Sequence, residues 1–542
     1  MRIALAQLNY HIANFQANNQ KIIQAINKAR DEKADLIVFA ELAIGGYPAK
    51  DLLRNQQYLQ ACQDSIQAIA THCKDISCII GAPTQNKDHE GKALYNSALL
   101  IENGEIQQLV HKSFLPDYDI FDEYRYFEPN KRFNCIDFKG YKLALTICED
   151  LWDDDGSNSY VGDLMAELRK EKPDYIINLA ASPFSYMQQQ ERFNVLKRQA
   201  IKAACPLIYV NQVGAHTDII FDGRSMVLNK IGELTHELKK FEEDFYLVDF
   251  AQEQPSLPAS VDAEIALIHK ALILGLRDYF RKSNFKQVVL GLSGGLDSAL
   301  VAALACEALG AENVLAILMP SKYSSDHSIK DALDLVANTG CRQETIAIGP
   351  MVEAFEASLG ALFAGKAADT TEENIQARVR GTLLMAISNK FGHILLNTSN
   401  KSEAAVGYGT LYGDMAGSLS VIGDVYKSQA FRLAEYMNRE REIIPVNTIV
   451  KPPSAELRPD QKDADSLPPY ELLDSVLFQL IELEKSAQEV IHAGFDQDLV
   501  LRIAKLLNNA EFKRFQAPPI LRVSPKAFGS GREFPLVAKN LF

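Results

Sequence analysis

A strand, a glycine turn and an apolar helix follow one another between residues 287 and 309. The apolar run "QVVL" leads into "GLSGGLDS", residues 291–298, and then into "ALVAALACEAL". Backbone N–H groups at such a helix start are unpaired, and an anion satisfies them while the helix dipole adds to the attraction. Glycines let the backbone approach a phosphate closely. This succession constrains the fold most, because doubly wound parallel sheets are built from it.

The same alternation surrounds the turn and defines a second domain. A stretch rich in proline and small polar residues, 251–261, is typical of a linker, and a helix is expected directly after it over 262–283. We therefore expect an α/β domain with a doubly wound parallel sheet over residues 262–542. Its further strands are expected at 313–320, 344–348 and 393–398.

The first 250 residues also alternate strands and helices. A helix is expected over 16–34, and Asn103-Gly104 is a hairpin-turn signal inside the run 97–110. Mixed strands and helices indicate sheets covered by helices, so residues 1–250 are expected to form an α/β domain of their own. The candidate strands are 2–8, 36–41, 78–83, 97–110, 141–149, 175–182, 206–213 and 224–234.

Length, charge and cysteine use exclude several classes of protein. A chain of 542 residues is too long for one core, and a formal charge of −14 makes it a poor general partner for nucleic acid or an anionic membrane. Eight cysteines without a C-x-x-C pair or zinc spacing indicate reduced thiols and a cytoplasmic setting. The start "MRIALAQLNY" is typical of a strand and not of a signal peptide, and no apolar run approaches the roughly 20 residues that span a bilayer.

Asp297 is the one residue of the turn that a phosphate would repel. We expect it to hold a Mg²⁺ ion that bridges the phosphates. The alternative is an ordinary glycine turn in which Asp297 or Ser298 caps the helix. The strand–turn–helix context and the full string "SGGLDS" favour the phosphate interpretation, and the missing Gly-Lys-Ser/Thr ending excludes a Walker A loop.

Further polar strings follow in the same domain. "ENIQARVR" (373–380) places two candidate ligands one helical turn apart, and "NTSNKSE" (397–403) follows a strand at the edge where such sheets bind ligands. A long polar segment occupies 451–470. Taken alone, each of these strings is more often a solvent-exposed helix face or a loop than a ligand site. The candidate residues are Asn374, Arg378, Thr398, Glu403, Asp414, Lys427, Ser454 and Lys513.

Together these strings carry a specific resemblance. "SGGLDS" resembles the PP-loop of ATP pyrophosphatases, and with "ENIQARVR", "NTSNKSE", "YGTLYGD", "PSAEL" and "SLPPY" it stands in the order of the NAD⁺ synthetase family. The resemblance implies that ATP adenylates the nicotinate carboxylate of deamido-NAD⁺ and that ammonia then displaces AMP. It places Asn374, Arg378, Glu403 and Lys513 near deamido-NAD⁺, with Asp297 and Glu403 as Mg²⁺ ligands. It assigns to ATP the residues Gly291, Leu292, Ser293, Gly294, Gly295, Leu296, Asp297, Ser298, Thr398, Lys427 and Ser454.

Three residues of the first domain stand in turn or strand-end contexts. They are Glu41 in "VFAELAIGGYP", Lys112 in "HKSFLPDY" and Cys148 in "LTICEDLW". A thiol beside a carboxylate that takes its proton and a lysine that steadies an oxyanion suits attack on a carboxamide carbon. Taken alone, a core cysteine, a helix-start glutamate and a solvated lysine are the commoner outcomes.

The motifs around these residues resemble those of the nitrilase superfamily over about residues 1–250. The resemblance implies a four-layer α-β-β-α sandwich with Glu41 as general base, Lys112 as oxyanion stabiliser and Cys148 as nucleophile, and Tyr118 and Ser182 as contacts of glutamine. A basic residue is expected near Gln188, within reach of the substrate α-carboxylate, and Gln188 is neutral. Arg192 is the alternative basic residue.

Both halves together resemble the glutamine-dependent members of the NAD⁺ synthetase family. The resemblance implies a homo-oligomer with glutamine, ATP and deamido-NAD⁺ as substrates, and a closed path for ammonia from Cys148 to the adenylate. Other hypotheses keep part of this chemistry: another PP-loop ligase, a tRNA-thiolating enzyme, or an amidase with a regulatory nucleotide-binding domain. A purely structural scaffold is disfavoured by the density of polar loop motifs.

Overall fold

The computed structural model describes residues 1–542 except 88–89, 153–159, 259–261, 460, 466 and 540–542. The chain separates into two compact units, Met1–Val261 and Asp262–Phe542. The last three residues of the expected linker, 259–261, lie outside the described residues. All eight cysteines carry free thiols. Within the part of the chain that is described, no helix has the length and apolar character needed to cross a membrane.

The first unit contains two six-stranded sheets and a separate two-stranded hairpin. One sheet has the order β14-β1-β2-β3-β4-β5, and the other has the order β13-β12-β9-β8-β7-β6. The strands of the first sheet are β1 (Arg2–Gln7), β2 (Leu36–Val38), β3 (Ser77–Gln85), β4 (Leu94–Glu102), β5 (Glu105–His111) and β14 (Asp244–Asp249). Those of the second are β6 (Ile136–Phe138), β7 (Tyr141–Ile147), β8 (Tyr175–Ala180), β9 (Leu207–Asn211), β12 (Met226–Leu228) and β13 (Leu234–Glu237). The hairpin is β10 (Val213–His216) with β11 (Ile219–Asp222).

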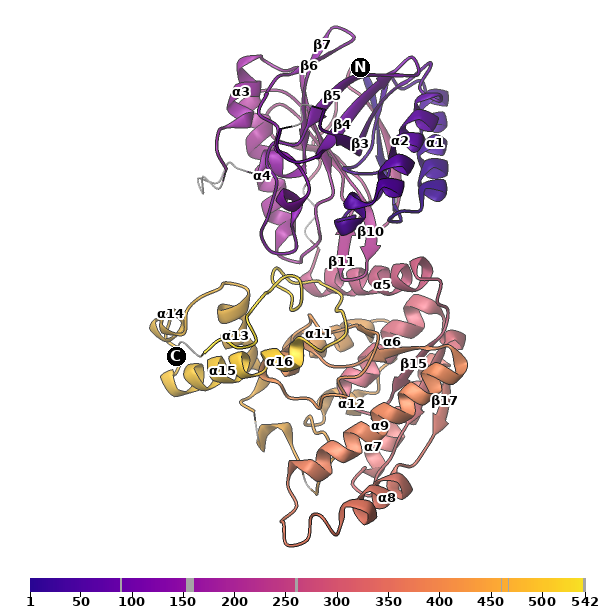
Figure 1. The fold of residues 1–542 in the computed structure, drawn as a ribbon, viewed down its shortest axis with the longest axis vertical. Coiled ribbons are helices and arrows are strands. Elements are labelled where there is room, and N and C mark those ends of the chain that lie inside the picture. The colour runs from indigo at the N-terminus through magenta and orange to yellow at the C-terminus, as the bar shows by residue number, and fades with distance from the viewer. Residues whose placement is uncertain (88–89, 153–159, 259–261, 460, 466, 540–542) are drawn as a thin grey trace. The chain divides into compact units, whose positions relative to one another are not determined.

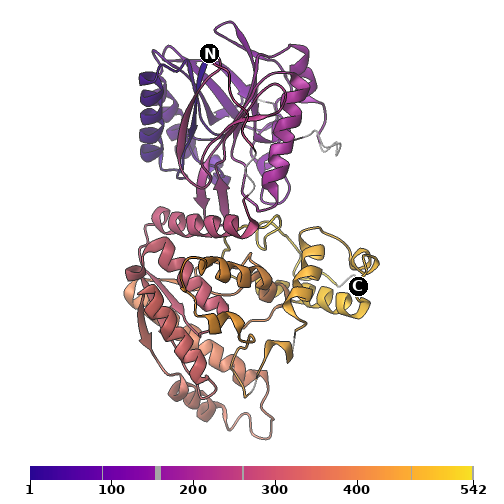
Figure 2. The same cartoon turned by 180° about the vertical axis from the view of Figure 1, so that it is seen from behind.

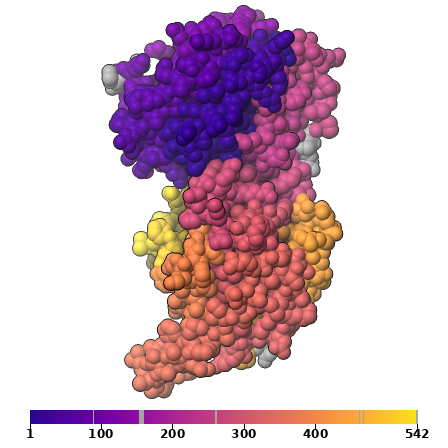
Figure 3. All heavy atoms as spheres, turned by 90° about the vertical axis from the view of Figure 1, so that its right-hand side faces the viewer, coloured from indigo at the N-terminus to yellow at the C-terminus, as the bar shows by residue number. Residues whose placement is uncertain are grey.

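Side chains that alternate between the two faces of each strand explain the layers of helices and sheets in this unit. Ile3 and Leu5 of β1 belong to the core that both sheets share, whereas Ala4 of the same strand packs with Ile22 and Ile26 of a helix layer. Each sheet is thus apolar on both faces and is covered by helices on its outer side (Figures 1 and 2), which confirms the expected four-layer α-β-β-α sandwich. Figure 3 shows the N-terminal segment of this unit in indigo. The helices are α1 (Phe15–Asp31) and α2 (Gln56–Ala70) on one side, and α3 (Leu164–Lys170) and α4 (Gln188–Ala203) on the other.

Two features of the first unit differ from the expected strands. The run 224–234 forms parts of two strands, β12 and β13, because Asn229 and Gly232 close a turn between them, with the Asn229 N–H donating to Glu233 O at 2.9 Å. The strands β6, β10, β11 and β14 were not expected, since they are short or carry polar residues. The predicted hairpin turn at Asn103-Gly104 is confirmed, with β4 and β5 pairing antiparallel on either side.

The second unit is built on a parallel sheet with the strand order β17-β16-β15-β18-β19. The order reverses between β15 and β18, and ligands of doubly wound sheets bind at such a reversal, beyond the carboxyl ends of the strands. The strands are β15 (Val288–Gly291), β16 (Val314–Leu318), β17 (Arg342–Thr345), β18 (Ile394–Asn397) and β19 (Leu419–Ser420). The doubly wound sheet expected from the sequence is confirmed.

Helices cover the sheet on its two faces (Figures 1 and 2). The helix that follows the glycine turn, α6, is buried along most of its length between the sheet and α5 and α11. On the other face, α9 packs against β15 and β18. The helices are α5 (Glu264–Lys282), α6 (Leu296–Leu309), α7 (Asp326–Thr339), α8 (Gly349–Leu359), α9 (Thr370–Phe391), α10 (Lys401–Val406), α11 (Lys427–Met437), α12 (Val446–Val450), α13 (Tyr470–Ile481), α14 (Ala487–His492), α15 (Gln497–Asn509) and α16 (Glu511–Arg514).

The expected strand at 344–348 is displaced toward the N-terminus. The strand β17 covers the exposed segment Arg342–Thr345 at the edge of the sheet and pairs with β16. The apolar side chain of Ile348 is buried beyond the strand, against the core that β15, β16 and α9 share. The apolar residues of 344–348 therefore indicated where the chain enters the core. They did not indicate which residues form the hydrogen bonds of the sheet.

Candidate active sites

The first unit brings Glu41, Lys112 and Cys148 together. Glu41 follows β2, Lys112 follows β5 and Cys148 follows β7. The Lys112 ammonium donates to Glu41 Oε1 at 2.7 Å, and both side chains are buried. Cys148 is buried as well, and the charges of Glu41 and Lys112 both act on its thiol. The trio that the sequence predicted therefore forms one buried cluster.

Cys148 occupies a constrained turn. Its φ of 44° lies in the left-handed region, which is unusual for a residue with a side chain, and it begins a short 3₁₀ turn, Cys148–Leu151. Asp150 holds this turn, because its Oδ2 accepts the Ile147 N–H at 2.9 Å. The other oxygen, Oδ1, accepts the N–H groups of Ser113 and Phe114 at 2.9 and 3.0 Å. The turn is thereby fastened to the segment that carries Lys112.

Charge and burial set the protonation of the cluster. Burial raises the pKa of Cys148, and the Glu41 charge raises it further against the opposing effect of Lys112. Cys148 therefore rests as a thiol, and it would need a base to act as a nucleophile. Burial acts against the charge of Lys112, but Glu123 and Glu41 outweigh it, so the pKa of Lys112 lies well above its usual value. Lys112 stays positively charged.

Glu123 belongs to this cluster and was missed from the sequence. Its Oε1 accepts Lys112 Nζ at 2.8 Å and the Tyr47 hydroxyl at 2.9 Å. The Asn96 amide bridges the two carboxylates, donating to Glu41 at 2.7 Å and to Glu123 at 3.3 Å. Burial, together with the Glu41 charge, raises the pKa of Glu123 to about 7 although Lys112 opposes the shift. One lysine thus serves two buried carboxylates.

Two of the residues predicted to contact glutamine, Tyr118 and Ser182, adjoin this cluster. The Tyr118 hydroxyl donates to Glu149 Oε1 at 3.0 Å, and Tyr160 donates to the same oxygen at 3.0 Å. Glu149, next to Cys148, is a second residue of this cluster that was missed from the sequence. Ser182 is buried, and Gln188 is half-buried at the start of α4.

Arg192 is not a free basic group for a substrate carboxylate. It is 1% exposed. Its Nη1 donates to both carboxylate oxygens of Asp222 at 2.9 and 3.1 Å, and its Nη2 donates to Pro183 O at 3.2 Å. The alternative in which Arg192 supplies the basic group absent at Gln188 is therefore wrong.

The second unit contains a cavity of about 980 Å³ at the carboxyl ends of β15 and β18. Its lining includes residues 291–298 except Gly294. Thr398, Glu403, Lys427 and Ser454, predicted from separate strings, line the same cavity. The volume lies in the range of small-molecule and cofactor sites.

The turn that begins the cavity requires glycine. Gly294 has a φ of +82°, and an added Cβ would lie 2.1 Å from the Ser328 carbonyl oxygen. Gly295 precedes α6 without a side-chain cap. The Ser293 and Ser298 hydroxyl oxygens lie 3.1 Å apart, and Ser293 Oγ accepts the Gly295 N–H at 3.2 Å, while α6, which is described over its whole length, has no side-chain hydrogen bond to its first helical N–H groups. These N–H groups are available to an anion, as the phosphate interpretation requires.

The two carboxylates predicted to bind Mg²⁺ share one lysine. Lys427 Nζ lies 2.5 Å from Asp297 Oδ2 and 3.7 Å from Glu403 Oε1. Burial and the Asp297 charge raise the pKa of Glu403 to about 8, against the effect of Lys427. A carboxyl group with this pKa is largely protonated at neutral pH, and a bound cation would favour its ionised form. No group of three or more His, Cys, Asp or Glu with metal-ligand geometry occurs among the described residues, so phosphate oxygens and water would have to complete the coordination of Mg²⁺.

Family models divide the chain as the structure does. A carbon-nitrogen hydrolase model matches residues 2–254, and an NAD synthase model matches residues 268–517. The glutamine-dependent NAD(+) synthetase of Synechocystis is 47% identical over 549 residues, with 98% of each chain covered. That of Acinetobacter baylyi is 41% identical, with 99% of this chain and 98% of its own covered. The chain belongs to the glutamine-dependent NAD(+) synthetase family.

Solved structures agree with this assignment. The glutamine-dependent NAD+ synthetase from Acinetobacter baumannii, in complex with ADP, is 37% identical with a TM-score of 0.77, and 99% of this chain and 98% of that one are covered. The enzyme from Cytophaga hutchinsonii shares the fold, with a TM-score of 0.84 at 22% identity over 99% of this chain and 98% of that one. As a member of this synthetase family the chain is an enzyme of the ligase class, as its resemblances implied.

Three predicted dinucleotide contacts of this synthetase lie outside the cavity, around residues 407–411. Asn374 Oδ1 accepts the Thr410 hydroxyl at 2.8 Å, and Arg378 Nε donates to Leu411 O at 3.3 Å. Lys513 Nζ donates to two carbonyl oxygens of the same loop, at 2.8 and 2.7 Å. Of the four predicted contacts, only Glu403 lines the cavity. The predicted set thus divides between the cavity and this neighbouring loop.

The synthetase cavity also has polar side chains that the sequence did not single out. Arg380 lines it, and burial lowers the pKa of Arg380 to about 10. Lys451 lines it too, with its ammonium 2.7 Å from Asp331 Oδ2. Asp414, which was among the candidates, also lines the cavity. Arg380 is distinguished from its neighbour Arg378 only by the side of α9 on which it lies.

Proposed function

We propose that this chain forms NAD⁺ from deamido-NAD⁺, ATP and glutamine in two reactions at two centres. The single observation that supports this best is that one chain contains both the buried Glu41–Lys112–Cys148 cluster and the cavity behind the glycine turn. Either centre alone fits other enzymes. Together they fit a synthetase that makes its own ammonia.

In the first unit, the Cys148 thiol attacks the carboxamide carbon of glutamine. Glu41 accepts the thiol proton, and Lys112 stabilises the negative charge that develops on the amide oxygen. The proton passes to the leaving nitrogen, so ammonia departs and a thioester remains. Water, activated by Glu41, then cleaves the thioester and releases glutamate with the thiol restored. Tyr118, Ser182 and Gln188 are proposed to contact the glutamine.

In the second unit, residues 291–298 bind the phosphates of ATP through backbone N–H groups and the two serine hydroxyls. Thr398, Lys427 and Ser454 contact the nucleotide, and Asp297 and Glu403 would hold Mg²⁺. Bound Mg²⁺ would neutralise phosphate charge as pyrophosphate leaves. The nicotinate carboxylate attacks the α-phosphorus, pyrophosphate departs, and ammonia displaces AMP from the resulting acyl adenylate.

Asn374, Arg378 and Lys513 are proposed to bind deamido-NAD⁺ from the adjoining loop. Lys513 and Arg378 supply positive charge for a dinucleotide that carries two phosphates. Because ammonia that is protonated in water cannot attack, we also propose a shielded path from Cys148 to the adenylate. A homo-oligomer is part of the proposal, and light scattering tests it.

Purified protein supplied with ATP, Mg²⁺, deamido-NAD⁺ and either glutamine or ammonium tests this function. We expect NAD⁺ and AMP to form in equal amounts with both nitrogen sources. A protein that fails to convert ATP to AMP when given deamido-NAD⁺ would contradict the proposal. Glutamine hydrolysis without AMP formation would favour the amidase with a regulatory nucleotide-binding domain instead.

A further inference from the structure

The loop that carries Ser182, residues 181–184, is fixed at each of its four residues. The Ala181 N–H donates to Glu41 Oε2 at 3.1 Å. Ser182 exchanges two hydrogen bonds with the Asn211 side chain, at 2.9 and 3.2 Å. The last anchor is the Phe184 N–H, which donates to Ile220 O of β11 at 2.7 Å. The loop thus lies between the proposed general base and the hairpin β10–β11.

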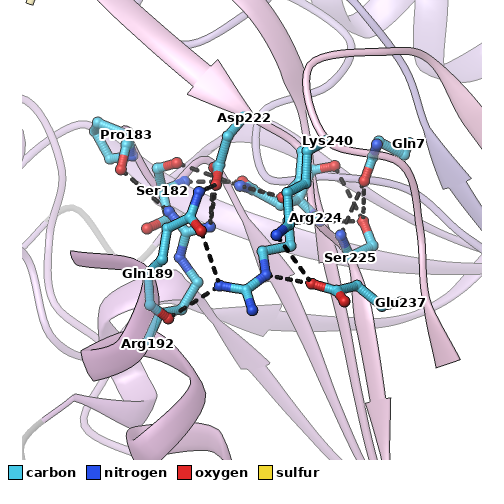
Figure 4. A network of polar contacts seen from close by, with 12 residues as sticks. Gln7, Ser182, Pro183, Gln189, Arg192, Asp222, Arg224, Ser225, Glu237 and Lys240 are labelled. Atoms are coloured by element: carbon cyan, nitrogen blue, oxygen red, sulfur yellow. Dashed lines mark hydrogen bonds and ion pairs between the residues drawn. The ribbon is translucent and has the colours of Figure 1, made fainter. Parts of the chain in front are cut away.

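The remaining anchor is a fully buried ion pair. Arg192 of α4 donates through Nη2 to Pro183 O, and through Nη1 to Asp222 at the end of β11. Arg192 is 1% exposed and Asp222 is 0% exposed. Figure 4 shows Arg192 between Asp222 and Pro183, with Ser182 beside them.

The energetics of such a pair point away from a role in stability. Removing two charges from water costs about as much as their attraction returns, so neutral replacements of a buried pair are often tolerated. What the pair does supply is geometry, because one planar guanidinium fixes two acceptors that belong to different elements. Here the two acceptors are Asp222 on β11 and the Pro183 carbonyl in the loop.

We propose that the Arg192–Asp222 pair is a positioning device for the glutamine subsite, which holds residues 181–184 so that Ser182 meets the substrate. The inference rests on the proposed glutaminase function. Neither residue contacts the reacting atoms in this account. Glu41 keeps two further partners, Asn96 and Lys112, so a displaced loop affects substrate binding more than the chemical step.

The double variant Arg192→Met, Asp222→Asn tests the proposal, because it removes both charges and the bond to Pro183 without leaving an unpaired ion. We expect KM for glutamine to rise about tenfold or more, since a displacement of about 1 Å at a site costs up to about 10²-fold. We expect kcat with glutamine to change less than about threefold and ammonium-dependent NAD⁺ formation to be unchanged. An unchanged KM for glutamine would overturn the proposal, and so would equal losses with glutamine and ammonium.

Glu237→Gln is the matched control. Glu237 pairs with Arg224, a buried arginine of the same polar network, and lies 3.9 Å from Lys240 Nζ (Figure 4). We expect this variant to keep the KM of the unchanged protein. A rise equal to that of the double variant would show that any disturbance of the network acts alike, and would overturn the specific role of Arg192 and Asp222.

Alkylation of Cys148 separates positioning from general disorder. Iodoacetamide lacks the amino-acid part of glutamine, so its rate with Cys148 should be the same in the double variant and the unchanged protein. A glutamine-like diazoketone needs the subsite, and its rate at low concentration should fall about tenfold, in step with KM. Parallel losses with both reagents would overturn the proposal.

Arg192→Lys keeps the test decisive if the double variant does not fold. Its single ammonium group cannot reproduce the two-pronged contact, so KM for glutamine should rise about threefold or more. A soluble Arg192→Lys protein with unchanged KM would overturn the proposal. Glutamate release by the unchanged protein is measured first: its absence would refute the glutaminase function itself, whereas its presence with unaffected variants refutes only the positioning role.

Discussion

The two proposed active centres differ in how complete they are. In the first unit, Lys112 pairs with two buried carboxylates, Glu41 and Glu123, at 2.7 and 2.8 Å. In the second, a cavity of about 980 Å³ lies behind the glycine turn, and Asp297 and Glu403 share Lys427, with Asn400 donating to Asp297. One centre is arranged in advance, and the other is completed by its ligands.

The difference follows from the chemistry proposed for each. Attack on a neutral carboxamide needs a base and an oxyanion contact that are already in place, because a small substrate contributes little binding energy to reorganise them. ATP and deamido-NAD⁺ bring several negative charges, and the free enzyme has to leave unpaired N–H groups and cation-binding carboxylates for them. The following variants test whether the centres can be separated in this way.

Replacing Cys148 should give the largest difference between the glutamine-dependent and the ammonium-dependent reaction. Cys148→Ala is expected to lower glutamine-dependent NAD⁺ formation by more than about 10³-fold, because no thioester can form. Ammonium-dependent synthesis should be unchanged. Comparison of NAD⁺ yields with the two nitrogen sources is the measurement, and residual glutamine-dependent activity near the normal rate would exclude Cys148 as nucleophile.

Asp297→Ala should damage the other centre, and with it both nitrogen sources. We expect NAD⁺ formation to fall by about 10²-fold or more, since one of the two carboxylates proposed to hold the charge-neutralising Mg²⁺ is lost. The measurement is AMP release with deamido-NAD⁺ and either glutamine or ammonium. Glutamate release should survive, and synthesis at a normal rate would remove the role proposed for Asp297 in metal binding.

Glu123→Gln tests whether the first centre depends on two carboxylates. Without the second charge, Lys112 pairs with Glu41 alone and weakens it as a base. We expect glutamine hydrolysis to fall by about 10²-fold while ammonium-dependent synthesis stays intact. A variant that hydrolyses glutamine normally would reduce Glu123 to a packing role.

The pH dependence of the first centre should show the same carboxylate. The pKa of Glu123 is raised to about 7 by burial and by Glu41, so Glu123 is ionised above pH 7 and gains a proton as the pH falls through 7. The rate of glutamate release should therefore decrease below pH 7, and well below pH 7 it should fall about tenfold for each pH unit. Glu123→Gln should lack this limb, and an identical limb in the variant would assign it to another group.

The smallest effect is expected at the neutral position of the glutamine subsite. Gln188→Arg places a positive charge at the start of α4, where Gln188 is half-buried. KM for glutamine should fall about threefold, the size of a partly solvated charge pair. A rise in KM would show that Gln188 contacts the substrate through its amide and that the departure from the expected basic residue is functional.

The sequence predicted both sheet architectures and the residues that stand in compact motifs. Cys148 and residues 291–298 follow apolar strands, and strand ends of this kind are where such folds present side chains to ligands. Lys112 and Glu41 could be assigned by resemblance, although nothing in their spacing brings them to a thiol more than 30 residues away.

Residues whose role depends on tertiary burial could not be predicted. Glu123 stands in "DIFDEYRYF" among other acidic residues, and only packing around Tyr47 and Lys112 distinguishes it. Lys513 was predicted near the dinucleotide, but its contact with a loop about 100 residues upstream in sequence follows from the docking of α16 on α10. For Arg192 the sequence suggested a positive charge available to a substrate. In the structure that charge is paired with Asp222, a buried residue of β11.

The transfer of nitrogen between the centres is the claim on which this account depends most. The direct measurement supplies the protein with ATP, Mg²⁺, deamido-NAD⁺ and glutamine labelled with ¹⁵N at the amide, in the presence of excess unlabelled ammonium. The account predicts that NAD⁺ carries the glutamine label well above its share of the free ammonia pool, with one AMP per NAD⁺. Label at the level of that pool, or NAD⁺ without AMP, would contradict it.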